Sequence, residues 1–333
     1  MCFSGARHLL PERIPSAKSR RESTVALRVI DLTDETMESI KTFGPTLRFL
    51  NLSGLNLAKL SEDVVTPLDS LERIDLSCNR LNEDSLPTSF QKLKSIKEVD
   101  LTHNKLAVIP RYVKRLRELA RLKLGQNRIA SIEGVEKMKR LQVLMLQENQ
   151  IEYLPRETLA NLRRLEILNC SRNCLRDLHP DVRFLRHLKD VDLSSNKLSS
   201  LPTELFLLPR LESLNASNNR LTRIPTINVR GRAKNRLAIC DLSENRIVKF
   251  PEHLLPLTEK LDLCRNRIRS LPVGVLKRLE VGLEQPELLL ADNPLITPPI
   301  DICVSGVKAI VQYFQEAKAE LKVYQGIKVW IIR

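Results

Sequence analysis

The sequence predicts an α/β solenoid, a curved horseshoe of about 11–12 stacked repeats with a parallel β-sheet on its concave face. The main observation is a motif, LxxLxLxxNxLxxLP, which recurs as IKEVDLTHNKLAVIP, LQVLMLQENQIEYLP and LKDVDLSSNKLSSLP. Its Asn occurs at 79, 104, 127, 149, 173, 196, 219, 245, 266 and 293, at intervals of 21–27 residues. Aromatic residues make up only 4% of the chain, against 42% hydrophobic residues in all. A core built from aliphatic side chains indicates repetition.

Each position of the motif has a physical role, and positions are numbered from its first Leu. In the repeat that begins at Leu188, Val191 and Leu193 occupy positions 4 and 6 and point into the core, because side chains alternate along a strand. Positions 3, 5 and 7 therefore point out onto the concave face. Asn196, at position 9, lies where the chain turns away from the strand. We expect its amide to bond backbone groups of its own and the next repeat.

The motif divides the chain into an N-terminal tail, a repeat region and a C-terminal segment. Residues 1–26 are rich in basic residues and contain two Pro, which predicts a flexible tail. Residues 27–299 form the predicted repeat region. Its first copy is degenerate, and the pattern would place Leu27, Ile30 and Leu32 at positions 1, 4 and 6.

The C-terminal segment, residues 300–333, changes character after two consecutive Pro. Ser305 is the expected N-cap of a helix that covers the open end of the core. Apolar residues follow it at helical spacing, at Val307, Ile310, Val311 and Phe314. The nearly continuous apolar run at 327–332 predicts a terminal strand.

The motif resembles that of leucine-rich repeat proteins, and is most similar to their intracellular class with repeats of about 23 residues and LP after the core Leu. Ras-binding and Ras-pathway scaffold proteins, the LAP scaffolds and the Roco family belong to that class. The resemblance implies an intracellular signalling scaffold whose partner is a protein, with a small GTPase as one such partner.

The closing segment NPLITPPIDICVSGVKAIVQYF is similar to that of several intracellular repeat arrays. In Roco-type proteins it leads into a GTPase domain. The sequence contains no GxxxxGK(S/T) motif, so it predicts no nucleotide site of its own. A second hypothesis is therefore that the chain is an N-terminal regulatory fragment of a longer Roco-like protein, a truncated form or a short isoform.

The cysteines and the termini bear on location. The odd set of seven is Cys2, Cys78, Cys170, Cys174, Cys240, Cys264 and Cys303. Scattered thiols in a chain without a recognisable signal peptide predict a reduced, cytoplasmic protein, with the nucleus as the alternative. No apolar run approaches the roughly 18 residues of a membrane span, so no transmembrane segment is predicted. The oligomeric state is left open.

The sequence predicts no enzymatic activity, and no catalytic, cofactor or metal site. Motifs such as GxSxG, HExxH, paired CxxC and GxGxxG do not occur, and the five His are scattered. Cys170 and Cys240 take core positions 6 and 4, where a thiol packs as a small apolar side chain.

The concave face is the predicted partner-binding surface. Position 5 is mostly Asn or Asp and position 7 mostly Ser, which are common consensus features of such repeats. The middle repeats differ, because they place an apolar cluster next to basic groups, as at an interface hot spot. The predicted contact residues are Arg121, Lys123, Val143, Met145, Ile167, Asn169, Asp192, Asn215 and Asp241.

The net charge of +14 predicts a second surface. Basic residues recur at position 10, directly after the Asn, and form a row along one flank. An insertion after Asn219 adds further basic residues. The residues singled out are Arg220, Arg230, Arg232, Lys234, Arg236 and Arg246. This basic flank favours a third hypothesis, an adaptor for an anionic ligand. Nucleic acid is disfavoured because aromatic residues are not interleaved with the basic ones.

Overall fold

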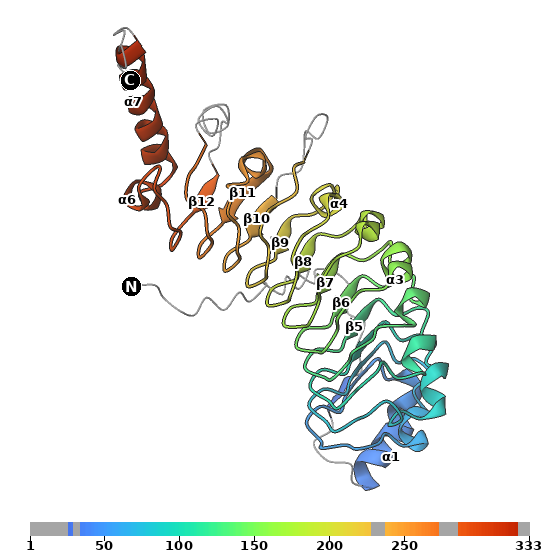
Figure 1. Ribbon diagram of the computed structural model, residues 1–333. Coiled ribbons are helices and arrows are strands. Elements are labelled where there is room, and N and C mark those ends of the chain that lie inside the picture. Colours follow the sequence, from blue (N-terminus) through green and yellow to red (C-terminus); the bar gives the residue numbers. More distant parts are fainter. Residues whose placement is uncertain (1–25, 29–33, 228–236, 273–285, 326–333) are drawn as a thin grey trace, which may run out of the picture.

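The computed structural model describes residues 26–28, 34–227, 237–272 and 286–325, and it confirms the predicted solenoid (Figure 1). Its sheet has twelve strands, each hydrogen-bonded in parallel to its neighbours in the chain. The strands are β1 Ala26–Arg28, β2 Phe49–Asn51, β3 Arg73–Asp75, β4 Glu98–Asp100, β5 Arg121–Lys123, β6 Val143–Met145, β7 Ile167–Asn169, β8 Asp190–Asp192, β9 Ser213–Asn215, β10 Leu237–Asp241, β11 Thr258–Asp262 and β12 Glu287–Leu289.

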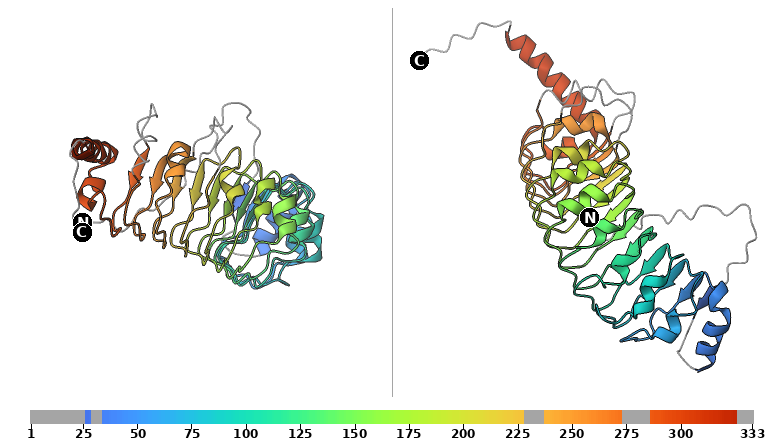
Figure 2. Two further views of the ribbon diagram at one scale, coloured as in Figure 1. Left: turned by 45° about the horizontal axis from the view of Figure 1, so that its top comes forward. Right: turned by 90° about the vertical axis from the view of Figure 1, so that its right-hand side faces the viewer.

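Short helices form the convex face, with α1 at one end of the stack and α7 at the other (Figure 2). The α-helices are α1 Asp34–Phe43, α2 Glu62–Val65, α3 Arg156–Asn161, α4 Thr203–Phe206, α6 Ile300–Val304 and α7 Val307–Gln325. The 3-10 helices are η1 Gly44–Thr46, η2 Thr88–Lys92, η3 Val113–Arg115, η4 Val135–Lys137, η5 Pro180–Phe184 and η6 Glu252–Leu257. Most convex segments span a single turn, because each repeat has little chain left after the strand and the Asn turn.

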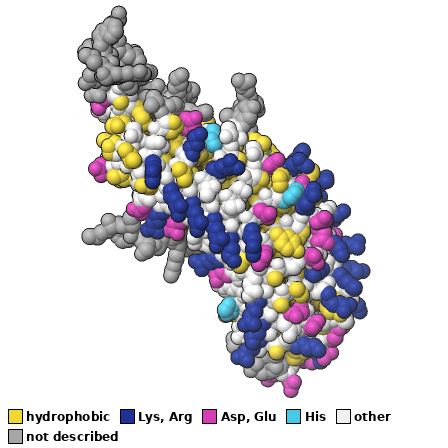
Figure 3. Space-filling model, in the orientation of Figure 1, with side chains coloured by type: hydrophobic (Ala, Val, Ile, Leu, Met, Phe, Trp, Pro, Cys, Tyr) yellow, Lys and Arg dark blue, Asp and Glu magenta, His cyan; other side chains and the backbone are white. Residues whose placement is uncertain are grey.

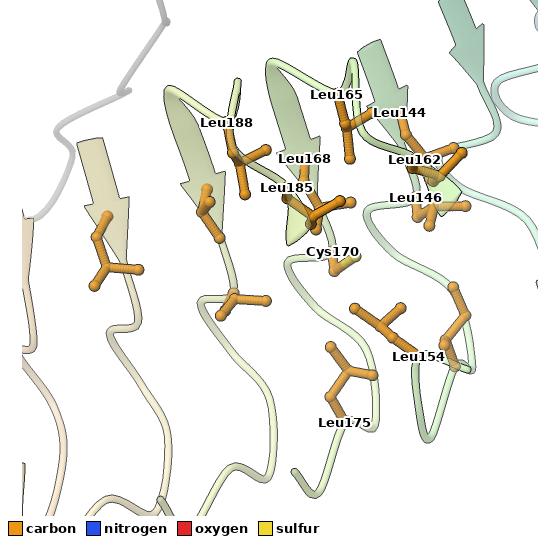
Figure 4. Packing of buried hydrophobic residues seen from close by; sticks show 14 of the residues in the cluster. Leu144, Leu146, Leu154, Leu162, Leu165, Leu168, Cys170, Leu175, Leu185 and Leu188 are labelled. Atoms are coloured by element: carbon orange, nitrogen blue, oxygen red, sulfur yellow. The ribbon is translucent and has the colours of Figure 1, made fainter. Parts of the chain in front are cut away.

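The core is one continuous column of mostly aliphatic side chains between the sheet and the convex segments (Figure 4). Leu168 and Cys170, at positions 4 and 6 of one repeat, are buried, whereas the flanking Ile167 and Asn169 are partly exposed. The same alternation in β6, β8 and β9 confirms that position 4 faces the core, and the residues at position 6 of these repeats are buried as well. Each coil shields the next, so burial depends on stacking.

A ladder of Asn side chains runs through the turns. The Nδ2 of Asn196 donates to the backbone oxygens of Leu193 (3.0 Å) and Cys170 (2.9 Å), and its Oδ1 accepts from the backbone N–H of Leu175 (2.9 Å). Cys170 and Leu175 belong to the preceding repeat, so the expected bond to the next repeat is wrong in direction. The Cys170 carbonyl and the Leu175 N–H that this side chain bonds both belong to the coil on the N-terminal side of Asn196.

The first repeat corrects a second expectation. Leu27 pairs in register with Leu50, which occupies position 4 of the next repeat. Leu27 therefore takes position 4 and not position 1. The motif there is too degenerate to fix the register, and the helix α1 begins soon afterwards, at Asp34.

At the C-terminal end, α6 and α7 pack against the last coil. Val307, Ile310 and Phe314 are buried, as their helical spacing predicts. Ser305 is not the N-cap of this helix, because it ends α6 and its Oγ donates to the backbone oxygen of Asp301 (2.8 Å). Gly306, with φ +97°, then turns the chain into α7. The tail up to residue 25 and the expected terminal strand lie outside the described residues.

Candidate partner-binding face

The parallel register brings the predicted contact residues together on the concave face. Arg121, Val143, Ile167 and Asp190 are aligned at position 3 of four neighbouring strands. The position-5 row consists of Lys123, Met145, Asn169, Asp192, Asn215 and Asp241 on β5 to β10. All nine predicted residues therefore lie on one surface, and Asp190 is a neighbour that the sequence analysis did not select.

Most position-5 residues have a structural role. The Oδ1 of Asn169 accepts from both the backbone N–H (2.9 Å) and the Oγ (2.7 Å) of Ser171, at position 7. The backbone bond recurs at Asp192, Asn215 and Asp241. Each Asn or Asp thus holds the turn that ends its own strand. These four predicted contact residues are explained by the fold before any partner is considered.

The pairing of positions 5 and 7 is interrupted on β5 and β6. Position 5 is Lys123 on β5 and Met145 on β6, and position 7 is Gly125 and Gln147. The Gln147 amide lies over Gly125, where a Cβ would come within 2.5 Å of its Nε2. The missing side chain at Gly125 therefore makes room for Gln147. On β5 and β6, unlike in the neighbouring repeats, the residues at positions 5 and 7 do not form the hydrogen bonds that close the turn after the strand.

The basic residues beside the apolar cluster belong to a charge network. Lys123 Nζ lies 3.1 Å from Glu98 Oε1 and 3.4 Å from Asp100 Oδ2 on β4. Arg73 also pairs with Glu98, at 3.5 Å, while Arg121 is more loosely placed at 3.9 Å. The Glu98 side chain is only 11% exposed. Lys123 is thus largely engaged within the fold, whereas Arg121, with 56% of its side chain exposed, remains accessible.

The network also sets the protonation state of Lys123. Burial lowers its pKa, but the hydrogen bond to Glu98 and the charges of Glu98 and Asp100 raise it by more, so the pKa lies above its ordinary value. Lys123 is therefore charged at neutral pH. Glu98 was missed because its partners come from the two repeats on either side of its own. The alternating charges at position 3 of Arg73, Glu98 and Arg121 were the available signal.

The apolar centre consists of Val143, Met145 and Ile167, all partly exposed. It lies between the β3–β5 charge network and an acidic margin at Asp190. Burial and the charge of Glu212 raise the pKa of Asp190, and Lys189 opposes them. A partly exposed apolar strip between a basic and an acidic margin can bind a protein segment with an apolar anchor and polar flanks.

The basic flank is described only in part. Arg220 and Arg246 are exposed, and their backbone N–H groups bond the carbonyls of Leu198 and Leu221 in the preceding repeats. Of the remaining predicted residues, Arg230, Arg232, Lys234 and Arg236 lie outside the described residues. The predicted row is thus present at position 10, and the basic residues of the insertion lie outside the described residues.

The described residues offer neither a metal site nor a reactive thiol in the core. Among the described residues, no three His, Cys, Asp or Glu side chains are grouped so as to hold a metal ion. Cys170 and Cys240 are fully buried, and burial raises the pKa of both thiols, which disfavours the reactive thiolate. No helix in the described part is long and apolar enough to cross a membrane.

Comparison with known proteins agrees with this geometry. The family model described as Leucine rich repeat matches residues 45–106, 70–129 and 139–185. This chain is a leucine-rich repeat protein. Such proteins typically mediate protein–protein interactions and are generally non-enzymatic binding scaffolds.

Relatives of this leucine-rich repeat protein include human podocan-like protein 1, which is 32% identical over 261 residues, covering 75% of this chain and 49% of that protein. The mouse podocan-like protein 1 is 30% identical, covering 74% and 45%. The chain thus spans about half the length of these relatives. The solved leucine-rich repeat protein LIC12759 of Leptospira interrogans shares the fold, with a TM-score of 0.61 and 23% identity over 82% of this chain and 85% of that one.

Proposed function

We propose that this protein is a non-enzymatic interaction module that binds a protein partner through the centre of its concave face. The contact surface consists of Arg121, Val143, Met145 and Ile167, with the charge network of β3–β5 on one side and Asp190 on the other. The interruption on β5 and β6 carries the proposal, because positions 5 and 7 of those two repeats lack the Asn or Asp and Ser that close the turn, and Met145 places an apolar side chain there.

Because of this network, we expect Lys123 to hold the surface in place and not to be the main contact for a partner. Its ammonium is already paired with two carboxylates, so a partner carboxylate would have to compete with Glu98 and Asp100. Arg121 is the accessible cation at the same margin. The expected partner therefore presents an apolar side chain to Met145 and Ile167, and a carboxylate to Arg121.

The finer setting that we propose is a cytoplasmic signalling scaffold, with a small GTPase as one partner class. Support comes from the motif and from the thiols, since all six cysteines in the described part of the chain are free and Cys170, Cys240 and Cys303 are buried. Microscopy of a tagged chain, together with identification of captured proteins, tests this. An exclusively extracellular protein would refute the setting and leave the concave site untouched.

The site itself is tested by a variant that removes the apolar strip and keeps the fold. In Met145→Asp with Ile167→Lys, each new charge faces an opposite charge on an adjacent strand. The new carboxylate at position 145 is aligned with Lys123, and the new ammonium at position 167 is aligned with Asp190. The matched control is Val108→Asp with Leu207→Lys, two exposed apolar residues away from the concave face. Both variants should unfold at nearly the wild-type temperature.

Affinity capture with quantitative mass spectrometry then compares the three proteins. We expect the partner recovered by the wild type and by the control to drop at least about tenfold with the concave variant, which corresponds to about 1.4 kcal/mol of binding free energy. Undiminished recovery with a folded concave variant refutes the proposed site. A wild type that recovers no protein in excess over an unrelated repeat protein refutes the proposed function.

A further inference from the structure

A row of basic side chains, interrupted at Gln150 and Cys174, follows the exit edge, the edge of the solenoid where the chain leaves each strand through positions 10 to 13 (Figure 3). Backbone N–H groups at position 10 donate to the position-11 carbonyl of the preceding repeat, for example from Arg246 to Leu221 and from Arg267 to Ile247, both 2.9 Å. Successive side chains are thereby held about one strand spacing, roughly 5 Å, apart. The basic members are Arg80, Lys105, Arg128, Lys197, Arg220, Arg246 and Arg267.

The charges of this row are not neutralised by the fold. Within the ranges that the structure describes, none of the seven makes an ion pair, and Lys197 only donates to Cys174 Sγ at 3.4 Å. Basic residues elsewhere behave differently. Arg265, two residues before Arg267, pairs with both Glu244 (2.8 Å) and Asp292 (3.4 Å). Unpaired like charges at such short spacing repel one another, and a counter-charge would relieve that repulsion.

Exposed aliphatic residues lie beside the C-terminal half of the row. Position 12 also stacks from repeat to repeat, since Val248 N–H bonds the carbonyl of Thr222 (3.3 Å) and Ile296 N–H bonds that of Arg269 (2.8 Å). Val248 is 57% exposed and Ile296 71% exposed. Arg223 and Lys249, at position 13, are exposed as well. Figure 3 shows hydrophobic side chains beside the C-terminal end of the basic row.

The opposite edge, where the chain enters each strand, provides the comparison. It is also basic, with exposed Lys139, Arg164 and Arg210. Its charges are partly paired, as in Arg140 with Glu118 and Lys189 with Glu166 (2.8 Å). None of the large exposed apolar side chains of the described residues belongs to this edge, which comprises residues 94–97, 117–120, 139–142, 163–166, 186–189 and 209–212.

We propose that the C-terminal half of the exit edge docks on an anionic membrane surface. The basic row faces the headgroups, while Val248 and Ile296 contact the boundary between the headgroups and the acyl chains. Nucleic acid would use the cations without the aliphatic residues, and single strands would favour stacking aromatic side chains there. The exit edge is separate from the concave face, so a docked molecule keeps that face open to a partner.

Vesicle co-sedimentation tests the charge component. The edge variant carries Arg220→Glu, Arg246→Glu and Arg267→Glu, and the control variant carries Lys139→Glu, Arg164→Glu and Arg210→Glu on the opposite edge. The two variants have the same net charge. The probes are phosphatidylcholine vesicles with and without about 30 mol% phosphatidylserine, at salt of about 0.05 and 0.15 M.

The wild type should sediment with the phosphatidylserine vesicles, less at the higher salt, and not with phosphatidylcholine alone. The edge variant should bind at least about tenfold more weakly, and the control variant within about threefold of the wild type. Absence of binding, or an equal loss in both variants, overturns the proposal. If the edge variant fails to show the wild-type unfolding transition, Arg246→Gln with Arg267→Gln replaces it, and Arg164→Gln with Arg210→Gln then serves as the control of equal charge.

The aliphatic component separates a membrane from other polyanions. Val248→Ser with Ile296→Ser should weaken binding to the phosphatidylserine vesicles several-fold and leave binding to duplex DNA unchanged. Tighter binding of the wild type to duplex DNA than to the vesicles, at both salt concentrations, overturns the proposal in favour of nucleic acid. Partner capture through the concave face should be the same for all these variants.

Discussion

The most consequential single residues are the Asn side chains of the turns. Asn149 donates to the backbone oxygens of Leu124 (2.9 Å) and Leu146 (3.0 Å), and accepts from the N–H of Ile129 (2.9 Å). All these groups are buried, so no water can replace a lost partner. One side chain therefore satisfies the backbone of two successive coils.

Replacement of Asn149 should accordingly be costly. We expect Asn149→Ala to lower the free energy of unfolding by about 2–4 kcal/mol, because at least one buried donor and two acceptors lose a partner. The neighbouring exposed residue supplies the control, since Gln150→Ala should change the same quantity by less than about 0.5 kcal/mol. Urea unfolding measures both. Similar values for the two variants would contradict the ladder's structural role.

Asp190 gives a prediction with a definite pH dependence. Burial and Glu212 raise its pKa in the folded chain, so the folded state binds the proton more readily than the unfolded state. The ionised carboxylate therefore destabilises the fold above that pKa, and the destabilisation disappears as the pH falls through the folded and then the unfolded pKa.

Asp190→Asn should thus stabilise the protein at pH 7, by less than about 1 kcal/mol because water still screens the half-buried side chain. The gain should shrink at a pH near 3, where the wild-type carboxyl is protonated. Thermal unfolding of both proteins at the two pH values is the measurement. A gain of equal size at both pH values would mean that the carboxylate's charge is not the cause.

At the scale of the elements, the charge network joins three neighbouring strands. Lys123 and Glu98 are mostly buried at the β4–β5 contact, and removal of one partner leaves the other charge poorly solvated. The Lys97–Glu72 pair, at 2.8 Å, links similar elements, but the Lys97 side chain is 63% exposed. The two pairs therefore differ in burial more than in geometry.

Double-mutant cycles should separate these pairs. For Lys123→Met and Glu98→Gln we expect a coupling free energy of about 1–3 kcal/mol, and for Lys97→Met and Glu72→Gln less than about 1 kcal/mol. Chemical denaturation of the four proteins in each cycle provides the values. A Lys123–Glu98 coupling no larger than that of the exposed pair would show that the network does not stabilise the sheet.

Some features of the strands and turns could be predicted from the sequence, and one could not. The inward positions 4 and 6 and the Asn turns followed from the motif, because the same apolar spacing recurs ten times. The left-handed residue at position 8 did not follow. Cys78 (φ 55°), Gln126 (φ 54°) and Arg265 (φ 54°) adopt it although their side chains do not favour it. The ladder bonds of the next repeat impose this conformation, as where the Cys78 N–H donates to Thr102 (2.9 Å).

For the candidate site, the sequence predicted which side chains share a surface but not what holds them. The alignment of Lys123 with Met145 follows from repeat numbering alone. The engagement of Lys123 by Glu98 depends on side-chain conformations across two strands, which a one-dimensional pattern does not contain. The Asn169 bond to Ser171 was local enough to be found, since Asn followed two residues later by Ser is a known turn pattern.

In the whole molecule, stacking turns the concave face into a continuous surface on which equivalent positions of successive repeats line up in rows. Most strands supply the same position-5 and position-7 chemistry, which closes the turns and leaves little to distinguish one repeat from another. The centre differs at Lys123, Gly125, Met145 and Gln147. We propose that a protein partner binds at this break in the repeat chemistry.

The most direct test places a photo-crosslinking amino acid, p-benzoylphenylalanine, at Met145 and, in a separate protein, at Leu207 on the convex side. Irradiation in cell extract should yield a discrete covalent adduct from the Met145 protein, with the crosslink in one partner peptide, and no adduct from the Leu207 protein. Addition of excess wild-type chain should suppress the adduct. An adduct at Leu207 with none at Met145 would contradict binding through the centre of the concave face.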